Sequence, residues 1–426
     1  MARDRVSTDL GTIRQVDRRK GVAMKTAFIP MTAVLMLVVL AIVVLLSARQ
    51  VSALPSFSRE HGLKCSDCHA GFPLLNEFGM EFKQRGFRLP DEDGKYPWEH
   101  KSLPVSVIGI MQYLNAHEDD PVTKARLSSA SKAEIDEIEI MAAGTVAPKV
   151  GFLAEFAQEV AAGGSFGNEQ IWMQFSDLLP TSMLNLRAGR MLNEQYYLSQ
   201  KRRLTFQRYL APVTFDVTGV EINGFWSGLR YAAGAVNDER EEGANIPSVN
   251  LDKKFQGFYA WGTYSRWDHI IGIRYINTKA NSDQPSPIID GRTRQQLDAT
   301  LNLRFGRGQV LLGYFHNWDI GGVAKQDRRN YLIEGILEVL PEKLFLDARY
   351  ELQDTGVVSG SPNNPAKANG NLVTAHASYY VTENVRAVVE FTKVRGEGLN
   401  VQGIGEPNGV ATGSQERYLV GIHFGF

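Results

Sequence analysis

From residue 103 to the C-terminus, apolar and polar residues alternate along the chain in segments of about ten residues. The segment 344–353 is an example, with apolar residues at Leu344, Leu346, Ala348, Tyr350 and Leu352. The residues between them are Phe345, Asp347, Arg349, Glu351 and Gln353. Successive side chains of a strand point to opposite faces of a sheet. Apolar residues on one face and mostly polar residues on the other are typical of a transmembrane β-barrel, whose outer face meets lipid.

Sixteen segments of this kind follow one another, at 103–114, 135–146, 150–160, 169–178, 182–190, 216–225, 229–238, 254–265, 269–279, 293–305, 309–319, 328–340, 344–355, 371–381, 385–396 and 415–426. Connectors of about three residues alternate with connectors of eight to 25 residues. Bacterial outer-membrane barrels have an even number of antiparallel strands, short periplasmic turns and longer outer loops. The sequence therefore predicts an all-β fold, a sixteen-stranded antiparallel transmembrane β-barrel over 103–426. A soluble β-sandwich is the alternative, and the aromatic Phe426 at the end of the last segment, as in outer-membrane assembly signals, favours the barrel.

The N-terminal residues predict export. Residues 31–46 are almost wholly apolar, follow Arg18, Arg19, Lys20 and Lys25, and precede the small residues at 51–53. This order of features is typical of a secretory signal peptide. An uncleaved inner-membrane anchor is the alternative, because about 20 apolar residues can span a bilayer. We expect a signal peptide over 1–53, with its true start at Met24.

Composition excludes several classes of protein. The chain has 46 Lys and Arg against 47 Asp and Glu, which is too neutral for a nucleic-acid-binding protein. Its two cysteines, Cys65 and Cys68, cannot form a disulfide framework or a four-cysteine zinc site. The two thiols therefore have a function together or none.

The two cysteines belong to a motif with a known chemistry. Residues 65–69 read Cys-Ser-Asp-Cys-His, and Cys-x-x-Cys-His is the attachment signature of c-type haem. The pattern predicts one covalent haem c on Cys65 and Cys68, with His69 as the proximal ligand of the iron. A chance motif or a thioredoxin-like dithiol is the alternative, and the latter lacks its βαβ context here.

The residues around the motif predict a small haem domain over 54–102. Leu75, Phe78 and Phe82 have the spacing of one face of a helix, so an α-helical domain is expected. A domain of this size cannot bury a core by itself, and it needs the haem and a neighbour to pack against. The sequence does not decide which residue is the distal iron ligand. The candidates are Met80, His100 and Met111, and each could equally have a structural role.

Charged residues occupy the positions that face the predicted lumen. They are of both signs and most are expected to be solvated or paired with one another: Glu155, Glu159, Arg187, Glu221, Arg230, Arg274, Asp298, Arg304, Glu334, Glu338, Asp347, Arg349, Glu351, Arg386 and Glu390. His376 and His423 face the same way. Lys201, Arg202, Arg203 and Arg208 lie in the longest loop, where they either fold into the lumen as a constriction or remain in water.

The haem segment also resembles a known family. Residues 53–69, followed by Phe72-Pro73, Phe78-Gly79 and Phe82-Lys83, are similar to the start of the fused monohaem cytochrome–porins of iron-oxidising bacteria. The chain departs from that family at Glu60-His61, where Gln-Thr is expected. The resemblance implies an outer-membrane protein that oxidises extracellular Fe(II) and passes single electrons to a periplasmic c-type cytochrome or another acceptor. Only Cys65, Cys68 and His69 carry over as functional positions.

The residues themselves leave two other functions open. The first is a diffusion porin in which the haem domain plugs or gates the channel. The second is electron transfer in the opposite direction, to an extracellular acceptor. Loop carboxylates at Glu118, Asp119 and Asp120 are weak attractors for metal cations on the outside, or simply solvated charges.

Overall fold

The computed structural model describes residues 55–120, 123–160, 166–241, 255, 257–279, 293–318, 327–355, 369–396, 399–400, 410–411 and 414–426. They belong to one compact unit, Ala53–Phe426. The expected signal peptide lies outside the described residues. Within the described ranges, every helix is too short or too polar to cross a lipid bilayer.

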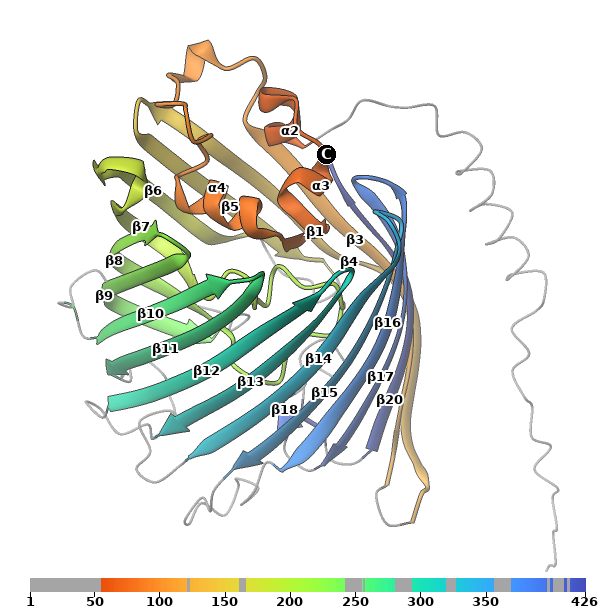
Figure 1. Ribbon diagram of the computed structural model, residues 1–426. Helices are drawn as coiled ribbons and strands as arrows, with labels where there is room; N and C mark the ends of the chain where they lie inside the picture. The colour runs from red at the N-terminus through yellow and green to blue at the C-terminus, as the bar shows by residue number, and fades with distance from the viewer. Residues whose placement is uncertain are drawn as a thin grey trace, which may run out of the picture. The chain divides into compact units, whose positions relative to one another are not determined.

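Sixteen antiparallel strands close into a barrel, as the alternation predicted (Figure 1). They are β3 Val105–Asp119, β4 Arg126–Ala147, β5 Val150–Glu159, β6 Gly167–Leu179, β7 Leu184–Glu194, β8 Thr214–Trp226, β9 Leu229–Glu241, β10 Gly257–Arg266, β11 His269–Lys279, β12 Thr293–Phe305, β13 Gly308–Trp318, β14 Arg328–Leu340, β15 Leu344–Thr355, β16 Gly370–Thr382, β17 Val385–Gly396 and β20 Ser414–Gly425. Each strand pairs with its neighbour in the chain, apart from the step from β17 to β20 across the two-stranded sheet of β18 Leu399–Asn400 and β19 Val410–Ala411. The last strand pairs with β3 and closes the ring.

The first hairpin is longer than the sequence pattern predicted. We expected a loop over 116–133, but β3 continues to Asp119 and β4 begins at Arg126, and these two residues are paired in register. Arg126 Nε also donates to Asp119 Oδ1 over 2.6 Å. Small polar residues such as Ser128 and Ser129 replace the apolar ones here, so the alternation that marks the other strands is lost although the backbone ladder continues.

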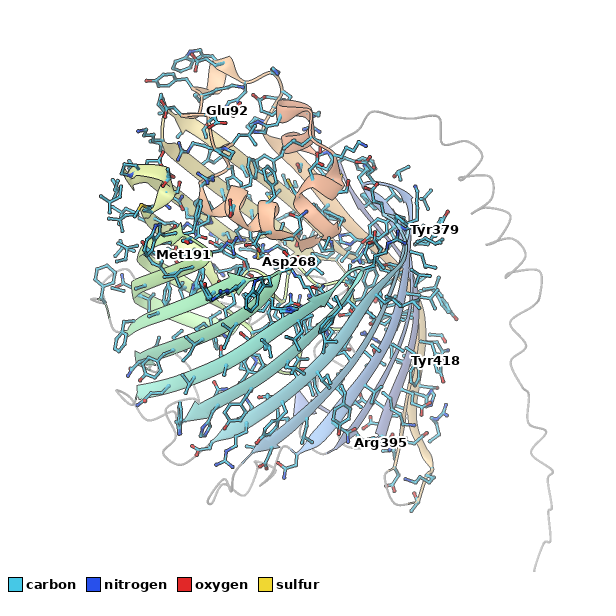
Figure 2. All side chains as sticks on the ribbon, in the orientation of Figure 1. Glu92, Met191, Asp268, Tyr379, Arg395 and Tyr418 are labelled. Atoms are coloured by element: carbon cyan, nitrogen blue, oxygen red, sulfur yellow. The ribbon has the colours of Figure 1, made fainter. Side chains whose placement is uncertain are left out.

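The two faces of the wall differ as the alternation requires. Apolar side chains such as Ile271 and Val389, each 59 % exposed, point outward, whereas Arg274 and Glu351 on the inner face are 1 % and 0 % exposed. Exposed aromatic residues gather near both ends of the strands. The set near the short turns is Phe175, Trp226, Tyr264, Trp267, Phe305, Tyr379 and Phe426, and the set near the opposite end is Tyr113, Phe156, Phe258, Tyr331, Tyr350 and Tyr418. Figure 2 shows Tyr379 and Tyr418 projecting from the outside of the wall at two heights.

The motif segment, residues 55–104, lies at the end of the barrel that carries the short turns (Figure 1). It contains α2 Ser56–His61, α3 Cys65–Cys68, β1 His69–Gly71, β2 Leu74–Leu75, α4 Glu77–Gln84 and the 3-10 turn η1 Pro97–Glu99. The expected helix around the three apolar residues begins later than its spacing suggested. Leu75 belongs to β2, and Asn76 caps α4 by accepting a hydrogen bond from the Gly79 amide over 2.9 Å.

Aromatic rings join this segment to the wall. The Phe57 ring stacks on Phe87 at 4.9 Å, and Phe87 stacks on Trp172 of β6 at 5.5 Å. Phe82 meets Phe57 edge-on at 5.1 Å. The segment therefore packs against the barrel, as expected of a piece of chain too small to bury a core by itself.

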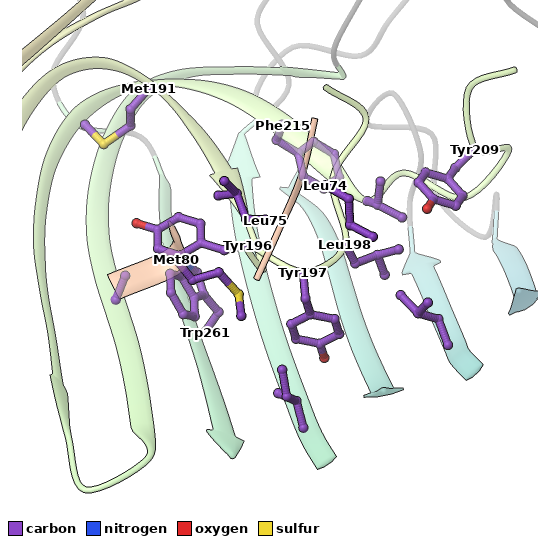
Figure 3. Close-up of a cluster of buried hydrophobic side chains, with 14 of the residues drawn as sticks. Leu74, Leu75, Met80, Met191, Tyr196, Tyr197, Leu198, Tyr209, Phe215 and Trp261 are labelled. Carbon is purple, nitrogen blue, oxygen red and sulfur yellow. The ribbon is translucent and has the colours of Figure 1, made fainter. Parts of the chain in front are cut away.

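A second piece of chain fills the middle of the barrel. The inward loop, residues 195–213 between β7 and β8, is buried over most of its length: Gln195, Tyr196, Tyr197, Leu198, Ser199, Gln200, Leu204, Thr205, Gln207, Tyr209, Leu210, Ala211 and Val213. Figure 3 shows Leu75 and Met80 of the motif segment beside Tyr196 and Tyr197 of the inward loop, with Trp261 of β10 against them. The apolar core of this protein thus lies inside the barrel, where the two pieces meet.

Candidate functional site

The two cysteines lie on the short helix α3, which is tied to the barrel wall. Its first turn is capped by Asp67, whose Oδ2 accepts from the Lys64 amide over 2.8 Å. The Cys65 amide donates to Glu383 Oε2, in the turn between β16 and β17, over 3.0 Å. Cys65 is 7 % exposed and Cys68 is half-buried, and both thiols are free. The wall therefore fixes the position of the motif.

Two contacts hold α3 against α4. The Asn76 side-chain amide donates to the carbonyls of Ser66 and Asp67 over 3.1 and 2.9 Å. Gly79, in α4, lies against the carbonyl of Cys68 so closely that any Cβ at this position would collide with that oxygen. Glycine is therefore required here by a close backbone approach.

His69 has one ring nitrogen committed and one available. Its Nδ1 lies 3.1 Å from the carbonyl of Pro73, which can only accept, so Nδ1 carries the proton and donates. Burial lowers the pKa of His69 to about 4, against the opposing effect of this hydrogen bond. The imidazole is therefore neutral at neutral pH and its Nε2 has a free lone pair, which is what an iron ligand requires.

The thiols and the imidazole fit a covalently bound haem. Burial raises the pKa of the Cys65 thiol to about 11, with a further contribution from the charge of Glu383. Burial likewise raises the pKa of Cys68 to about 11, with smaller contributions from Asp67 and Cys65. Both sulfurs are thus neutral thiols near neutral pH. A c-type haem would use them for its two thioether bonds and His69 Nε2 for its iron.

The three distal candidates have different surroundings. Met111 lies on the outer face of β3 and is 45 % exposed, so its side chain points away from the lumen. In His100, Nε2 lies 2.8 Å from the Thr145 carbonyl oxygen and Nδ1 lies 3.4 Å from Glu60 Oε1. Both ring nitrogens of His100 are therefore engaged. Met80 is 1 % exposed and lies inside the barrel, which leaves it as the remaining candidate (Figure 3).

Glu60 binds residues near the end of the motif segment. Its carboxylate accepts from Lys95 Nζ and from the Lys101 amide, both over 2.8 Å. Burial would raise the pKa of Glu60, but these hydrogen bonds and the charges of Lys95 and His100 lower it to about 2. Glu60 therefore anchors the end of the motif segment. His61 lies near Glu92, with Nδ1 3.6 Å from Oε2.

Further bonds tie the motif segment to strands around the ring. Gln84, which is 0 % exposed, donates to the carbonyl of Gly224 in β8 over 2.6 Å and accepts from Gln174 in β6 over 2.8 Å. On the opposite side, the Tyr380 hydroxyl of β16 donates to the Phe72 carbonyl over 2.7 Å. Arg230 of β9 forms an ion pair with Glu77. The segment thus lies across the end of the barrel.

Charged residues of the wall hold the backbone of the inward loop. Glu390 accepts from the amides of Phe206 and Gln207 over 2.6 and 2.8 Å, and Glu351 accepts from the Ala211 amide over 3.0 Å. Arg349 donates to the Gln207 carbonyl over 2.7 Å. We expected these lumen charges to be solvated or paired with one another, and many of them instead bind this loop.

Arg274 and Arg386 complete the attachment. Arg274 donates to the carbonyls of Asn193, Pro212 and Val213 over 2.8 to 2.9 Å and also pairs with Asp298. Arg386 donates to the Leu204 carbonyl over 2.9 Å. These attachments could not be located from the sequence, because a loop that folds into a lumen has no periodicity of its own.

The basic residues of the loop do fold into the lumen, which settles the alternative that the sequence left open. Lys201 Nζ lies 3.2 and 2.9 Å from carboxylates of Glu137 and Glu139 and also contacts Glu169. Burial would lower the pKa of Lys201, but the carboxylates hold it well above its ordinary value. The three carboxylates come close enough to share a cation, and the ammonium of Lys201 lies among them.

The outer carboxylates are engaged in the first hairpin. Asp119 pairs with Arg126, and Asp120 Oδ1 accepts from the Thr123 amide over 2.6 Å. Glu118 is 9 % exposed. These residues stabilise the end of the hairpin, and their geometry adds nothing to the hypothesis of a metal-attracting site.

Comparison with known proteins identifies the fold. No protein-family model and no curated protein matches the chain. Among solved structures, the anion-selective porin from Comamonas acidovorans is similar, with 14 % identity, a TM-score of 0.54, and coverage of 76 % of this chain and 99 % of that one. OmpF of Salmonella typhi in complex with daunomycin is similar too, with 12 % identity, a TM-score of 0.53, and coverage of 76 % and 97 %. The chain therefore has the β-barrel fold of outer-membrane porins.

Proposed function

We propose that this protein transfers electrons across the outer membrane, from extracellular Fe(II) to a periplasmic c-type cytochrome or another acceptor, through a single covalent haem c. The observation that carries the proposal is the Cys65–His69 motif inside the end of the barrel, with His69 Nδ1 bound to the Pro73 carbonyl and Nε2 available. The resemblance to fused monohaem cytochrome–porins supplies the donor and the direction. In this role the protein is an oxidoreductase that transfers one electron at a time.

The wall supports an outer-membrane location. Its outward apolar band lies between two sets of exposed aromatic residues, as in outer-membrane barrels. The short turns would then face the periplasm and the extended β3–β4 hairpin would face outward. Trypsin added to intact cells should cut at Lys124, in the tip of that hairpin, and spare Lys343, in a short turn. The opposite pattern would reverse the orientation.

Each residue of the motif has a role in holding the haem. Cys65 and Cys68 would form the thioethers, and each thiol hydrogen would pass to a carbon of a haem vinyl group. His69 would bind the iron through Nε2 while the Pro73 carbonyl fixes the ring. Met80 is the remaining candidate for a second iron ligand. A bound haem would supply reversible one-electron exchange.

The filled lumen favours a conductor of electrons over an open pore. The motif segment crosses the short-turn end, and the inward loop is bonded to the wall by Arg274, Arg349, Glu351 and Glu390. These bonds are buried, and a hydrogen bond to a charged group contributes about 1.5–3 kcal/mol. The two pieces therefore narrow the route that is left for a solute.

A diffusion porin that the motif segment plugs or gates is the second candidate. The fold is the observation that favours it, because both similar structures named above are porins. Conductance in planar bilayers separates the candidates. A stable, ohmic current through the purified full chain would favour the porin, and a closed baseline would favour electron transfer.

The test of the proposed function is a visible spectrum of the purified protein titrated with Fe(II). Under anaerobic conditions and at the growth pH of the host, Fe(II) should reduce the oxidised haem within the mixing time, and the haem bands should sharpen and shift. A haem that stays oxidised in excess Fe(II) would refute iron as the electron donor. A spectrum without haem bands would refute the electron-transfer function itself.

A further inference from the structure

An exposed pair of aromatic rings lies on the motif segment shortly before the barrel begins. Tyr96 and Trp98 stack with their ring centroids 5.0 Å apart and their planes 2° from parallel. Trp98 is 78 % exposed and Tyr96 is 40 % exposed. Trp98 belongs to the 3-10 turn η1 and Tyr96 precedes it, so neither ring is part of the proposed haem attachment.

The turn that carries the rings is held by hydrogen bonds within it and at both ends. The Tyr96 amide donates to Glu99 Oε2 over 2.8 Å, which closes the turn on itself. Glu60 of α2 accepts from Lys95 Nζ and from the Lys101 amide, both over 2.8 Å, on either side of the turn. A surface that is already ordered loses less conformational entropy when a partner binds it. The aromatic pair is therefore a preformed surface on the same segment as the motif.

The stretch around the rings is acidic. Residues 91–101 have three exposed acidic side chains, which are Asp91, Asp93 and Glu99. Of the two lysines in this stretch, Lys101 is exposed and Lys95 is paired with Glu60. Tyr and Trp are enriched at the centres of protein interfaces, where they contribute much of the binding energy. Because charge complementarity speeds the encounter of two proteins, an acidic surface of this kind favours a partner with a basic surface.

The position of the stretch favours a protein over lipid as its partner. In Figure 1 the orange chain between α4 and β3 rises past the short-turn end of the wall, and Figure 2 shows Glu92 of this chain there. The Asp93 carbonyl accepts from the amide of Lys149, so this chain crosses the short turn between β4 and β5. The exposed tryptophans Trp226 and Trp267 belong instead to a strand end and a short turn of the wall. Anionic lipid surfaces attract basic side chains and therefore repel acidic ones.

We propose that the aromatic turn, residues 91–101, is the docking surface for the periplasmic electron acceptor, and that this acceptor is a soluble redox protein with a basic surface. The inference rests on the proposed function, because it requires a haem that passes electrons to the periplasm. Tyr96 and Trp98 provide the apolar centre of the interface, and the three exposed carboxylates provide its rim. One electron leaves the ferrous haem and reduces the docked acceptor, which does not have to enter the barrel.

The test is the rate at which the full-length protein reduces a ferric c-type cytochrome with a strongly basic surface. The haem is first reduced with dithionite, the excess is removed, and mixing is followed by stopped flow. Trp98→Ala should lower the second-order rate constant about tenfold, because it removes the centre of the interface. Asp91→Asn with Asp93→Asn should lower it about tenfold at low ionic strength, and this loss should disappear in high salt, which screens surface charges.

Trp267→Ala is the matched control for the aromatic ring, and Asp268→Asn with Glu342→Gln is the control for the charges. Trp267 is as exposed as Trp98, at 78 %, and lies in another short turn. Asp268 and Glu342 are exposed carboxylates of short turns, so their removal changes the net charge by the same amount. Both controls should keep the wild-type rate within a factor of about two, as surface substitutions do.

The charge of the partner has its own measurement. A c-type cytochrome with an acidic surface should react slowly with the wild type and faster with the Asp91→Asn, Asp93→Asn variant. Equal wild-type rates with the acidic and the basic cytochrome would overturn the basic partner. Rates of Trp98→Ala and of the double variant that match those of the controls would overturn the docking surface. A reduced wild-type haem that does not reduce the basic cytochrome would overturn it as well.

Contact with lipid is the other outcome, and it is measured in proteoliposomes that contain brominated phospholipid, which quenches tryptophan fluorescence. The difference between wild type and Trp267→Phe should report a quenched Trp267. The difference between wild type and Trp98→Phe should report a Trp98 that is not quenched. A quenched Trp98 would assign the turn to the membrane and overturn the inference.

This failure is distinguishable from failure of the proposed function. The haem is reduced with dithionite, so a haem that Fe(II) cannot reduce would refute iron oxidation and still allow the rates to be compared. A wild-type protein without covalent haem would refute both.

Discussion

The two pieces of chain inside the barrel are held in different ways. The inward loop is attached mainly through its backbone, which bonds to buried charged residues of the wall such as Arg274, Arg349 and Glu390. The motif segment is attached mainly through its side chains, by stacked aromatic rings such as Phe87, by hydrogen bonds such as those of Gln84, and by ion pairs such as that of Glu77 with Arg230. The proposed haem attachment involves residues of the motif segment and none of the inward loop. If the proposal holds, occupation of the lumen by the loop and attachment of the haem should therefore be separable.

The largest expected effect is that of removing both thiols. Cys65→Ala with Cys68→Ala should abolish haem staining on a denaturing gel, because no covalent link remains. The barrel should still fold and stay closed, because the bonds of the inward loop do not involve these residues. Ser66→Ala, between the cysteines, is the control and should stain like wild type. Staining that survives in the double variant would refute covalent attachment at this motif.

The next effect concerns the attachment of the loop. Arg274→Met should destabilise the protein by about 3–5 kcal/mol, because it leaves the buried Asp298 carboxylate without its partner. Arg274→Met with Asp298→Asn should recover part of that loss, and both variants should raise bilayer conductance. Urea unfolding in detergent and planar-bilayer recording provide the two measurements. Equal stability of wild type and Arg274→Met would show that the loop is not held as described.

A smaller effect is expected where α4 meets α3. Gly79→Ala forces a methyl group against the Cys68 carbonyl and should cost about 1–3 kcal/mol through overpacking. Its main consequence should be a lower yield of covalent haem at unchanged barrel folding. Gly167→Ala is the matched control, since nothing lies within 4 Å of a Cβ at that position. Equal haem content in the two variants would show that the contact between Gly79 and the Cys68 carbonyl is not needed for haem attachment.

The barrel was predictable from the sequence because each strand of a membrane wall alternates apolar side chains toward lipid with polar side chains toward the lumen. In β15, for example, Leu346 meets the outside and Asp347 the inside, and the rule holds over the length of the strand. The rule fails where both faces of a hairpin meet water, which explains why the ends of β3 and β4 were misplaced. The motif at residues 65–69 was recognisable because the haem attachment that it predicts requires residues close together in sequence.

Contacts between distant parts of the chain were not predictable. Arg386 and His423 are 37 residues apart, and their pairing depends on the register of β17 against β20. The contact between Phe72 and His423 depends in addition on where the motif segment lies in the barrel. The inward direction of the loop follows from charges on many strands at once, and no local pattern reports it.

The smallest expected effect concerns the end of the motif segment. Glu60 has its pKa lowered from 4.5 to about 2, so its contacts with Lys95 and the Lys101 amide contribute stability above pH 4.5. That contribution should be lost as the pH falls from about 4.5 through about 2. Pepsin should cleave the region around Tyr96 more readily over this range. Glu60→Gln should be cleaved readily throughout, and Asp91→Asn, at an exposed position, should behave like wild type. Equal cleavage of Glu60→Gln and wild type at pH 4 would contradict this role.

The central claim is that electrons cross a barrel that solutes do not. Proteoliposomes that contain the full-length protein in their membrane and an oxidised c-type cytochrome inside provide the most direct measurement, with Fe(II) added outside under anaerobic conditions. The account predicts that the enclosed cytochrome is reduced while an enclosed iron-chelating dye stays uncoloured, and that Cys65→Ala with Cys68→Ala abolishes the reduction. Entry of iron at the rate of cytochrome reduction, or no reduction with a haem-loaded protein, would contradict it.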